Sequence, residues 1–592
     1  MLFCIIAAFL VLLARLFYLQ IIKGNEYRRL SESNCIRIQY IKPQRGLIFD
    51  RNGTLLVDNR PSFDVNIILK DAKPLHSTLD ALSRYIHVPV QELLDRINQR
   101  SAPAFKSILL MEDVGRDVTS AIKAHQYELP GVGIDVVPRR QYIYKKSAAH
   151  LLGYLGEINA DELRSGNYPE ARSGDYVGRF GIEKIYEPYL RGRGGGRQVE
   201  VDAAGKVVRV LKTVDARQGH EIQLTIDSPL QRKTEELLEG KVGAIVAMDP
   251  ETGYVLAMAS SPSFDQNEFV NGISRDKWRV LIDNPDKPLQ NKAIQALYPP
   301  ASTYKIITAL AGLEEGVVND QTTVFCPGAY RFGDRTFRCW KRQGHGKMNV
   351  EDALTQSCDV FFYQVGRLVG VDKLADCATA FGLGSKTGIE LGHEERGLIP
   401  TSQWKKRRTG VAWQAGETLS VAIGQGYNLV TPIQMAVLTS ALANDGIRVK
   451  PLIVKQIRTV DGTVLIENQP QAIGRLPFSK KNLDRVRKAL WKVVQGERGT
   501  GKIARIKDID ISGKTGTAQV ISRKRNEDNP EEMLSKHLPH AWFVAYAPSG
   551  NPQIAVAVIV EHGEHGSSGA GPIARDLIQS YLAGKNKTDA EG

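Results

Sequence analysis

One apolar stretch constrains the fold of this chain more than any other. Two prolines at positions 299 and 300 interrupt whatever precedes them, and residues 301–313 are apolar on nearly every face of a helix. A helix of this kind has to be buried in a large core. With 592 residues, the chain is long enough for two or more domains with such cores.

Ser302 and Lys305 lie on that predicted helix. Residues three apart share a helix face, so the lysine amine can reach the serine hydroxyl and activate it as a nucleophile. The same Ser-x-x-Lys spacing also occurs at 120–123, 274–277 and 402–405, in stretches that we expect to be solvated surface. Burial is what keeps a lysine amine neutral enough to accept a proton. We therefore predict Ser302 as the nucleophile and Lys305 as its base.

The charge balance narrows the class of ligand. The chain carries 78 Lys and Arg against 65 Asp and Glu, a net charge of +13, which suits an anionic substrate or an anionic membrane surface. No zinc-finger helix, RNA-binding aromatic signature or concentrated basic stripe is present, so nucleic acid is not indicated. The largest basic cluster, 405–408, is interpreted as a solvated loop.

Residues 2–22 form an apolar segment just long enough to cross a bilayer. We interpret it as a single membrane anchor. The alternative is a cleaved signal peptide, but no basic leader precedes the run and no small-residue cleavage site follows it. Lys23, Arg28 and Arg29 follow the segment, and by the positive-inside rule they would favour a cytoplasmic body.

The pattern of apolar and turn-forming residues in the rest of the chain predicts an α+β protein with a domain boundary near residue 218. Asn52-Gly53 between apolar runs indicates a hairpin, residues 75–130 look mostly helical, and 136–144 returns to strand character. Beyond 218, an Asp249-to-Gly253 turn joins two strands, further strands are expected at 542–546 and 554–561, and a helix near 570–582 closes the domain. This segregation favours an antiparallel sheet covered by helices. The predicted units are an anchor (1–22), an elongated β-rich pedestal (23–217), a catalytic domain (218–584) and a polar tail (585–592).

Two later motifs can complete a catalytic site around Ser302. Ser357-Cys358-Asp359 offers a hydroxyl and a carboxylate from one turn, and Lys514-Thr515-Gly516-Thr517 lies in a strand-like run. Lys514 and Thr517 could hold a substrate carboxylate, while Gly516 lets a substrate backbone approach closely. A second Lys-Thr-Gly at 386–388 lacks a strand pattern and is interpreted as a turn.

Ser-x-x-Lys, then Ser-x-Asp, then Lys-Thr-Gly, in this order, resembles the penicillin-binding protein and serine β-lactamase superfamily. The stretches 45–53, 178–192 and 424–436 are similar to class B penicillin-binding proteins, and no second catalytic domain precedes residue 218. Asp359 at the third position of the second motif is typical of the elongation type, penicillin-binding protein 2.

The resemblance implies a peptidoglycan D,D-transpeptidase of the cell inner membrane, with its catalytic domain in the periplasm and β-lactams as covalent inhibitors. Ser302 would attack the bond between two terminal D-alanines, with Lys305 as base, and Ser357 would pass the proton to the leaving amine. Asp359 belongs to the same site, and Lys514, Thr515, Gly516 and Thr517 would bind the substrate end. The amides of Ser302 and Thr517 would form the oxyanion hole. No cofactor is needed for catalysis, and the implied partners are a glycosyltransferase of the SEDS family and the scaffold protein of the rod complex.

Cysteines cluster around the first two motifs. Cys326, Cys339, His345 and Cys358 are 13, 6 and 13 residues apart, and three thiolates with one imidazole make a suitable tetrahedral zinc set. Some elongation-type relatives are thought to carry structural zinc between these motifs. The alternative is a Cys326–Cys339 disulfide, favoured by an oxidising compartment. Of the other cysteines, Cys4 lies in the anchor, and Cys35 and Cys377 have no evident partner.

Two other functions fit the same motifs. A β-lactamase would be a free enzyme less than half as long and would need a placed deacylating water. A β-lactam receptor would need a cytoplasmic effector, and nothing precedes Leu2 to supply one. The anchor and the long N-terminal part therefore favour the transpeptidase.

Overall fold

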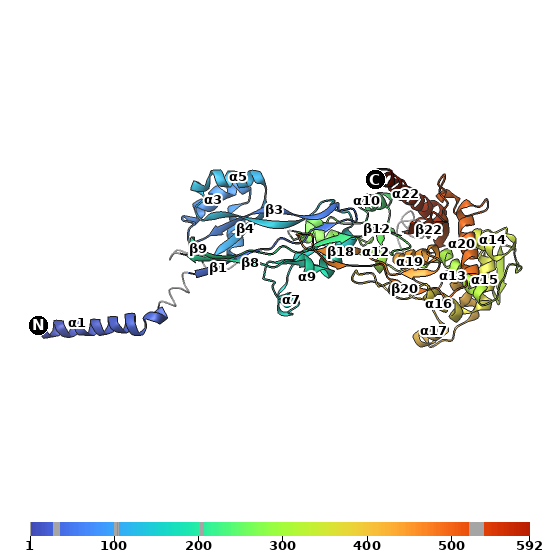
Figure 1. Ribbon diagram of the computed structural model, residues 1–592, viewed down its shortest axis with the longest axis horizontal. Coiled ribbons are helices and arrows are strands. Elements are labelled where there is room, and N and C mark those ends of the chain that lie inside the picture. Colours follow the sequence, from blue (N-terminus) through green and yellow to red (C-terminus); the bar gives the residue numbers. More distant parts are fainter. Residues whose placement is uncertain are drawn as a thin grey trace.

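The computed structural model describes residues 2–27, 36–99, 104, 106–201, 207–270, 272–519 and 538–591. The molecule is elongated (Figure 1), with the N-terminal helix at one end, a β-rich pedestal next to it and a larger mixed domain at the other end. This is the predicted α+β architecture.

The N-terminal helix matches the predicted anchor. Helix α1 (Leu2–Phe17) continues into a π-helical turn, η1 (Tyr18–Ile22). Together they form 21 residues with a mean hydropathy of 2.6, and none of this segment is buried inside the protein. Its length and composition suit a single-pass membrane anchor.

The pedestal is built on a seven-stranded sheet in the order β19-β18-β10-β2-β3-β4, with β5 also paired to β3. Asn52 and Gly53 lie in the predicted hairpin between β2 and β3, where Gly53 has a φ of 86°. Residues 75–130 form three helices as expected, but β4 lies among them, because Ile108 and Leu110 alternate with more exposed neighbours and face the core. The bounds are β2 Ile48–Phe49, β3 Leu55–Ile68, α3 Leu75–Ile86, α4 Val90–Gln99, β4 Ser107–Val114, α5 Arg116–Ala124, η2 Gln126–Glu128 and β5 Val132–Tyr142.

This sheet runs across the predicted boundary near residue 218. Strand β10 (Glu221–Leu224) pairs in parallel with β2 of the pedestal and antiparallel with β18 (Val454–Arg458), which pairs with β19 (Val464–Glu467). Backbone hydrogen bonds therefore join the two parts of the chain, and the division at 217/218 stays a prediction.

The rest of the pedestal contains a second sheet and several short elements. The three-stranded sheet has the order β1-β8-β9 and lies near the anchor in Figure 1. Two short helices, α8 and α9, lie in the stretch 178–192, and the second ends at Leu190. The bounds are β1 Ile36–Ile41, α6 Ala149–Leu152, β6 Leu155–Glu157, α7 Ala160–Arg164, β7 Tyr176–Gly178, α8 Gly181–Ile185, α9 Glu187–Leu190, β8 Gly195–Val201 and β9 Val207–Val214.

A five-stranded antiparallel sheet, β12-β11-β23-β22-β21, organises the C-terminal domain. The predicted hairpin at 249–253 and the strands at 542–546 and 554–561 are confirmed. Strands β11 and β23 are buried along their whole length because helices cover both faces of the sheet. The bounds are α10 Ser228–Leu237, β11 Gly243–Met248, β12 Val255–Ser261, α19 Pro432–Ala443, α20 Lys480–Gln495, β21 Ser512–Ala518, β22 His540–Ala547 and β23 Ile554–Val560.

Two expectations about secondary structure are wrong, one for the polar tail and one for the basic run. The closing helix α22 (Gly571–Glu591) begins as predicted but continues through the expected polar tail. The basic run at 405–408 lies in helix α17 (Ser402–Thr409), where Lys405 is buried and bonded to Glu417 at 2.6 Å. A lysine in a charged sequence run can thus be buried when a carboxylate accompanies it.

The remaining elements complete the C-terminal domain. They are η3 Gln266–Phe269, α11 Arg275–Ile282, α12 Lys292–Gln295, η4 Ala301–Tyr304, α13 Lys305–Glu314, β13 Val324–Cys326, β14 Ala329–Phe332, β15 Arg335–Arg338, β16 Gly346–Met348, α14 Val350–Thr355, α15 Asp359–Val369, α16 Val371–Ala380, α18 Ala415–Ala422, β17 Ile447–Val449, β20 Ala472–Arg475, η5 Lys502–Ala504 and η6 Gly566–Ala570.

Candidate active site

Ser302 lies at the start of the buried helix, as the sequence predicts. The turn η4 leads directly into α13, and Ala301 before the serine has a φ of 50°, which is unusual for a residue with a side chain. Gly424 lies against this turn: its carbonyl accepts a hydrogen bond from the Ala301 amide at 2.9 Å, and a Cβ at Gly424 would lie 2.1 Å from the Ala301 oxygen. Tight packing of this kind holds Ser302 half-exposed at the wall of a cavity of about 930 Å³.

Lys305 is completely buried one turn beyond Ser302, but its environment differs from the prediction. Its Nζ donates to Asp359 Oδ1 at 2.6 Å, to the Ser357 carbonyl at 2.9 Å and to Ser357 Oγ at 3.2 Å. None of its hydrogen bonds within the described part of the chain involves Ser302. The expectation rested on burial alone, whereas the structure also gives the amine a carboxylate partner, Asp359, at 2.6 Å.

The second motif is held at the start of helix α15. Ser357 has a φ of 55°, Cys358 occupies the N-cap, and Asp359 is the first helical residue. The second carboxylate oxygen of Asp359 accepts a hydrogen bond from the Trp340 amide at 2.9 Å. The expectation that the serine hydroxyl and the carboxylate point the same way agrees with this geometry, since both contact the Lys305 amine.

The third motif lies on β21, at the edge of the five-stranded sheet. Gly516 packs against the nucleophile turn, because a Cβ there would lie 3.1 Å from Thr303 Cγ2 and 3.2 Å from the Pro300 oxygen. Lys514 is completely buried, and burial together with the nearby Lys305 lowers the pKa of Lys514 well below its usual value, although Asp359 acts in the opposite direction. Its amine donates to the Thr515 carbonyl at 3.1 Å.

The three motifs meet at one cavity. Five predicted residues line it, while Lys305, Lys514 and Gly516 belong to the layer behind. Sequence reasoning missed Thr500, whose hydroxyl lies 2.9 Å from that of Thr515, and Gln425, whose side chain donates to the Thr517 carbonyl at 3.4 Å. Gln425 lies between Gly424 and Gly426, and Thr500 lies between Gly499 and Gly501, so flanking glycines were a usable signal for both residues. The predicted lining residues are Ser302, Ser357, Asp359, Thr515 and Thr517.

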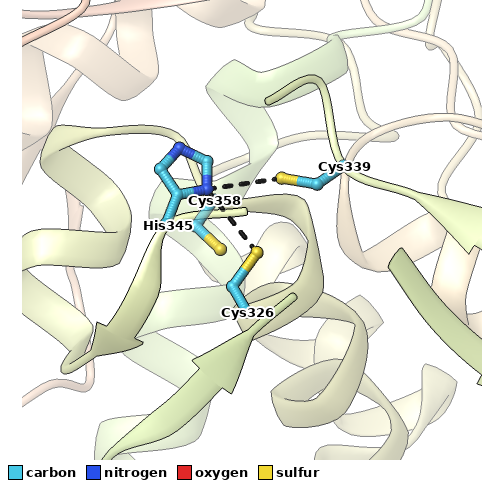
Figure 2. A group of neighbouring side chains, drawn as sticks. All are labelled: Cys326, Cys339, His345 and Cys358. Atoms are coloured by element: carbon cyan, nitrogen blue, oxygen red, sulfur yellow. Dashed lines mark hydrogen bonds between the residues drawn. The ribbon is translucent and has the colours of Figure 1, made fainter. Parts of the chain in front are cut away.

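The three cysteines and the histidine also converge (Figure 2). Their candidate ligand atoms all lie within 4.8 Å of one another, and His345 Nδ1 is 3.6 Å from Cys326 Sγ and 3.5 Å from Cys339 Sγ. All of these cysteines are free thiols, so the Cys326–Cys339 disulfide is not formed. A hydrogen bond from the Cys358 thiol, with a second from His345, lowers the pKa of Cys339 strongly.

The remaining cysteines do not join this cluster. Cys377 is buried on α16 and its thiol donates to the Ile307 carbonyl at 3.5 Å. Cys4 is exposed on the anchor helix. Cys35 lies outside the described residues.

Comparison with known proteins agrees with the site. The family model for the penicillin-binding protein transpeptidase domain matches residues 243–579, and the model for the penicillin-binding protein dimerisation domain matches residues 40–224. A peptidoglycan D,D-transpeptidase, MrdA, from Acinetobacter baumannii is 38% identical, and the match covers 98% of this chain and 87% of that protein.

Solved structures give the same answer. Penicillin-binding protein 2 from Helicobacter pylori, in complex with MreC, has a TM-score of 0.80 at 30% identity, covering 92% of this chain and 99% of that one. A chain from a peptidoglycan synthase complex that coordinates polymerization and crosslinking has a TM-score of 0.72 at 30% identity, covering 98% and 97%. Since both the family models and a near-full-length relative match, this chain belongs to the penicillin-binding protein family, in its penicillin-binding protein 2 branch.

Proposed function

We propose that this chain is a serine-type peptidoglycan D,D-transpeptidase of the elongation type, which forms its acyl-enzyme on Ser302. One observation carries the proposal: a half-exposed serine shares a single cavity with a Ser-x-Asp turn and a Lys-Thr-Gly edge strand. That arrangement supplies a nucleophile, proton-transfer groups and a binding strand at one place. The A. baumannii relative carries the same activity in its name.

In this proposal, the terminal carboxylate of a stem peptide binds at Lys514, Thr515 and Thr517. A carboxylate bound there would raise the pKa of Lys514, in the direction opposite to the effect of burial. Because β21 is an edge strand, the substrate can lie beside it in an extended conformation, and Gly516 leaves room for its backbone.

The serine hydroxyl then attacks the carbonyl between the two D-alanines. Its proton passes to the amine of Lys305, which acts as the base, the new bond to the carbonyl carbon forms at Ser302 Oγ, and the oxyanion is stabilised by the amides of Ser302 and Thr517. Ser357, bonded to Lys305, delivers a proton to the departing D-alanine amine. The amine of a neighbouring stem then attacks the ester and releases the serine. A placed base contributes about 10²–10⁴-fold and each oxyanion donor about 10²–10³-fold.

Covalent labelling tests the assignment of the nucleophile. The Ser302→Ala variant of the full chain in detergent is expected to bind no fluorescent penicillin while keeping the melting temperature of the wild type. The matched control is Ser402→Ala, which alters the serine of another Ser-x-x-Lys sequence, a partly exposed residue whose hydroxyl donates to Asp372 at 2.7 Å. Persistent labelling of the Ser302 variant would refute the proposal.

We also propose that Cys326, Cys339, His345 and Cys358 hold a structural zinc ion. A tetrahedral site with bonds of about 2.0–2.3 Å has edges near 3.3–3.8 Å, and the two sulfur-to-nitrogen distances fit that range. When bound, the ion would cross-link three segments of the chain. Since Cys358 lies between Ser357 and Asp359, these residues would then fix the second motif in place.

Metal analysis with a thiol count tests the zinc site. We expect one zinc ion per chain. When a chelator removes the zinc, the three cluster cysteines should become reactive toward a thiol reagent. Cys377→Ser is the control, because that buried cysteine lies outside the cluster. Purified protein with no zinc would end this proposal without affecting the assignment of Ser302.

We further propose that residues 2–22 anchor the chain in the cell inner membrane and that the catalytic domain faces the periplasm, where peptidoglycan is cross-linked. The apolar helix supports the anchor. The periplasmic side follows from the proposed substrate, although Lys23 and the basic residues after it argue for the opposite orientation. Protease added to intact spheroplasts is expected to digest the catalytic domain.

The partners are proposed from the solved relatives. One of these is bound to MreC and another belongs to a peptidoglycan synthase complex. By the same arrangement, this chain would bind a rod-complex scaffold protein of the MreC kind and a SEDS-family glycosyltransferase. Co-purification of the full chain with each cognate protein under native conditions tests this. If neither protein co-purifies with the chain, the proposal is contradicted.

A further inference from the structure

The segment from 324 to 348, which we call the cationic lobe, has an unusual charge distribution. It forms β13 to β16, between the nucleophile helix and the second motif. It contains six basic residues and a single acidic residue, Asp334. All six basic residues are exposed: Arg331, Arg335, Arg338, Lys341, Arg342 and Lys347.

These charges have no carboxylate partners in the part of the chain that the structure describes. Several basic residues elsewhere in the same domain do have them: Arg485 pairs with Asp320, Arg487 with Asp445, and Lys405 with Glu417. The lobe therefore keeps a positive field that the protein itself does not neutralise, and such a field attracts anionic ligands.

Two of the six cations border the active site. Arg338 and Arg342, with Trp340 between them, line the same cavity as Ser302. Their backbone is fixed, because the Tyr363 hydroxyl donates to the Arg338 carbonyl at 3.1 Å and the Trp340 indole donates to the Gln356 and Ser357 carbonyls at 3.1 Å. These bonds hold the Arg338 backbone and the Trp340 ring against the second motif, while the side chains of Arg338 and Arg342 stay exposed at the cavity.

We propose that Arg338 and Arg342 bind carboxylates of the substrate peptide that lie upstream of its two terminal D-alanines. This inference rests on the proposed function and names a second recognition region for the same substrate. The strand β21 takes the terminal carboxylate, so the cationic lobe is left for the internal ones. A guanidinium can bind a carboxylate through two hydrogen bonds, which gives direction as well as attraction. The site selects acidic stem peptides over neutral ones.

Competition with a fluorescent penicillin measures this selection without requiring turnover. The probes are two synthetic pentapeptides ending in D-Ala-D-Ala, one with its internal carboxylates free and one with them amidated. With the full-length wild type, the free-carboxylate peptide is expected to protect Ser302 at a roughly fivefold lower concentration, since each exposed ion pair contributes a factor of about 1.4–5. In the Arg338→Gln/Arg342→Gln variant, the two peptides should protect equally.

Matched variants separate this site from a general effect of charge. Arg331→Gln/Lys347→Gln removes the same charge from the same lobe, at residues that do not line the cavity, and it should keep the preference. The proposal is overturned if the Arg338/Arg342 variant keeps the full preference, or if the control variant loses it equally. It is also overturned if the Arg338/Arg342 variant reacts more than twofold more slowly with penicillin, because the arginines would then act on the catalytic groups. Failure of the proposed function itself shows separately, as penicillin labelling that survives Ser302→Ala.

Discussion

At the scale of single residues, Lys305 shows that burial does not by itself decide what a lysine does. The sequence placed it on an apolar helix, and the side chain is indeed completely buried. What sequence could not show is that Asp359, 54 positions away, would lie at 2.6 Å and pair with it. Lys514 on the edge strand is also completely buried, and burial lowers its pKa well below the usual value. The proton-transfer groups therefore act as a set, and removing one changes the others.

Substitution of Lys305 tests its role in proton transfer. Lys305→Gln is expected to lower the rate of acylation by penicillin about 10²–10⁴-fold, because the path for the serine proton is lost. Lys292→Gln is the matched control, since Lys292 is also buried but its amine donates to the Asp286 carbonyl away from the cavity. Stopped-flow labelling gives both rates. Wild-type acylation by the Lys305 variant would contradict the role.

His150 gives the protein a pH-dependent stability. Burial lowers the pKa of His150 to about 4, and the ring nitrogen lies 2.6 Å from the Pro288 carbonyl, across the predicted boundary. Between pH 6.5 and 4 the unfolded state therefore binds a proton that the folded state does not, so stability falls as the pH falls through this window and is complete above pH 6.5.

The comparison of wild type with His150→Gln measures that effect. Over the same window the wild type should lose on the order of 2–3 kcal/mol more of its free energy of unfolding than the variant. Thermal unfolding in detergent at several pH values would show it. Parallel pH profiles for the two proteins would mean that His150 is accessible to protons in the folded state.

At the scale of elements, the edge strand β21 and the nucleophile turn depend on each other. Gly516 faces Thr303 and Pro300 on one side and Trp542 on the other, where an added Cβ would lie 2.9 Å from the Trp542 Cβ. The Pro300 oxygen belongs to the backbone and the Trp542 Cβ is bonded directly to it, so neither atom can move away without a backbone shift. The strand can approach the serine only because this position has no side chain.

A single added methyl group tests that contact. Gly516→Ala is expected to slow penicillin acylation at least tenfold and to cost about 1–3 kcal/mol of stability, because the strand has to move away from the turn. The control is Gly392→Ala, in the same domain, where nothing lies within 4 Å of the added Cβ. Penicillin labelling gives the acylation rates, and thermal unfolding gives the change in stability. A Gly516→Ala variant with wild-type values would show that the strand can accommodate a methyl group.

Elements with a local signal were predictable from sequence, and those set by distant partners were not. Neighbouring residues determine three of these elements: the helix that follows Pro300, the turn at 249–253 and the strand that contains Lys514. Strand β4 was missed inside a helical region, and the helix at 402–409 was missed because its buried lysine depends on Glu417. The catalytic motifs were found by their order, whereas Thr500 reaches the cavity only through tertiary packing.

At the scale of the whole molecule, hydrogen bonds and buried charges join the pedestal to the catalytic domain. The seven-stranded sheet contains strands from both parts. Within the pedestal, Glu183 is completely buried and accepts from Arg45 at 2.6 Å and Arg140 at 2.7 Å. Burial alone would raise the pKa of Glu183, but Arg140 and Arg45 hold it below its usual value. This network joins the stretches 45–53 and 178–192. The sequence showed that both resemble the family, but it did not show that they are in contact.

Neutralising that carboxylate tests how far the network supports the molecule. Glu183→Gln is expected to cost about 3–5 kcal/mol, because two buried guanidinium groups lose their shared anion. Glu200→Gln, which affects an exposed pair with Arg209, should cost less than about 1 kcal/mol. Unfolding of the two variants compared with wild type gives the difference. Similar costs for both would mean that the buried network is relaxed by water.

The most direct test of the central claim is mass spectrometry of the full-length protein after reaction with penicillin. The account predicts one adduct per chain, and digestion should place it on the peptide that contains Ser302, with the Ser302→Ala protein unmodified. An adduct on Ser357 or on another serine, or no adduct on a folded wild-type protein, would contradict the account.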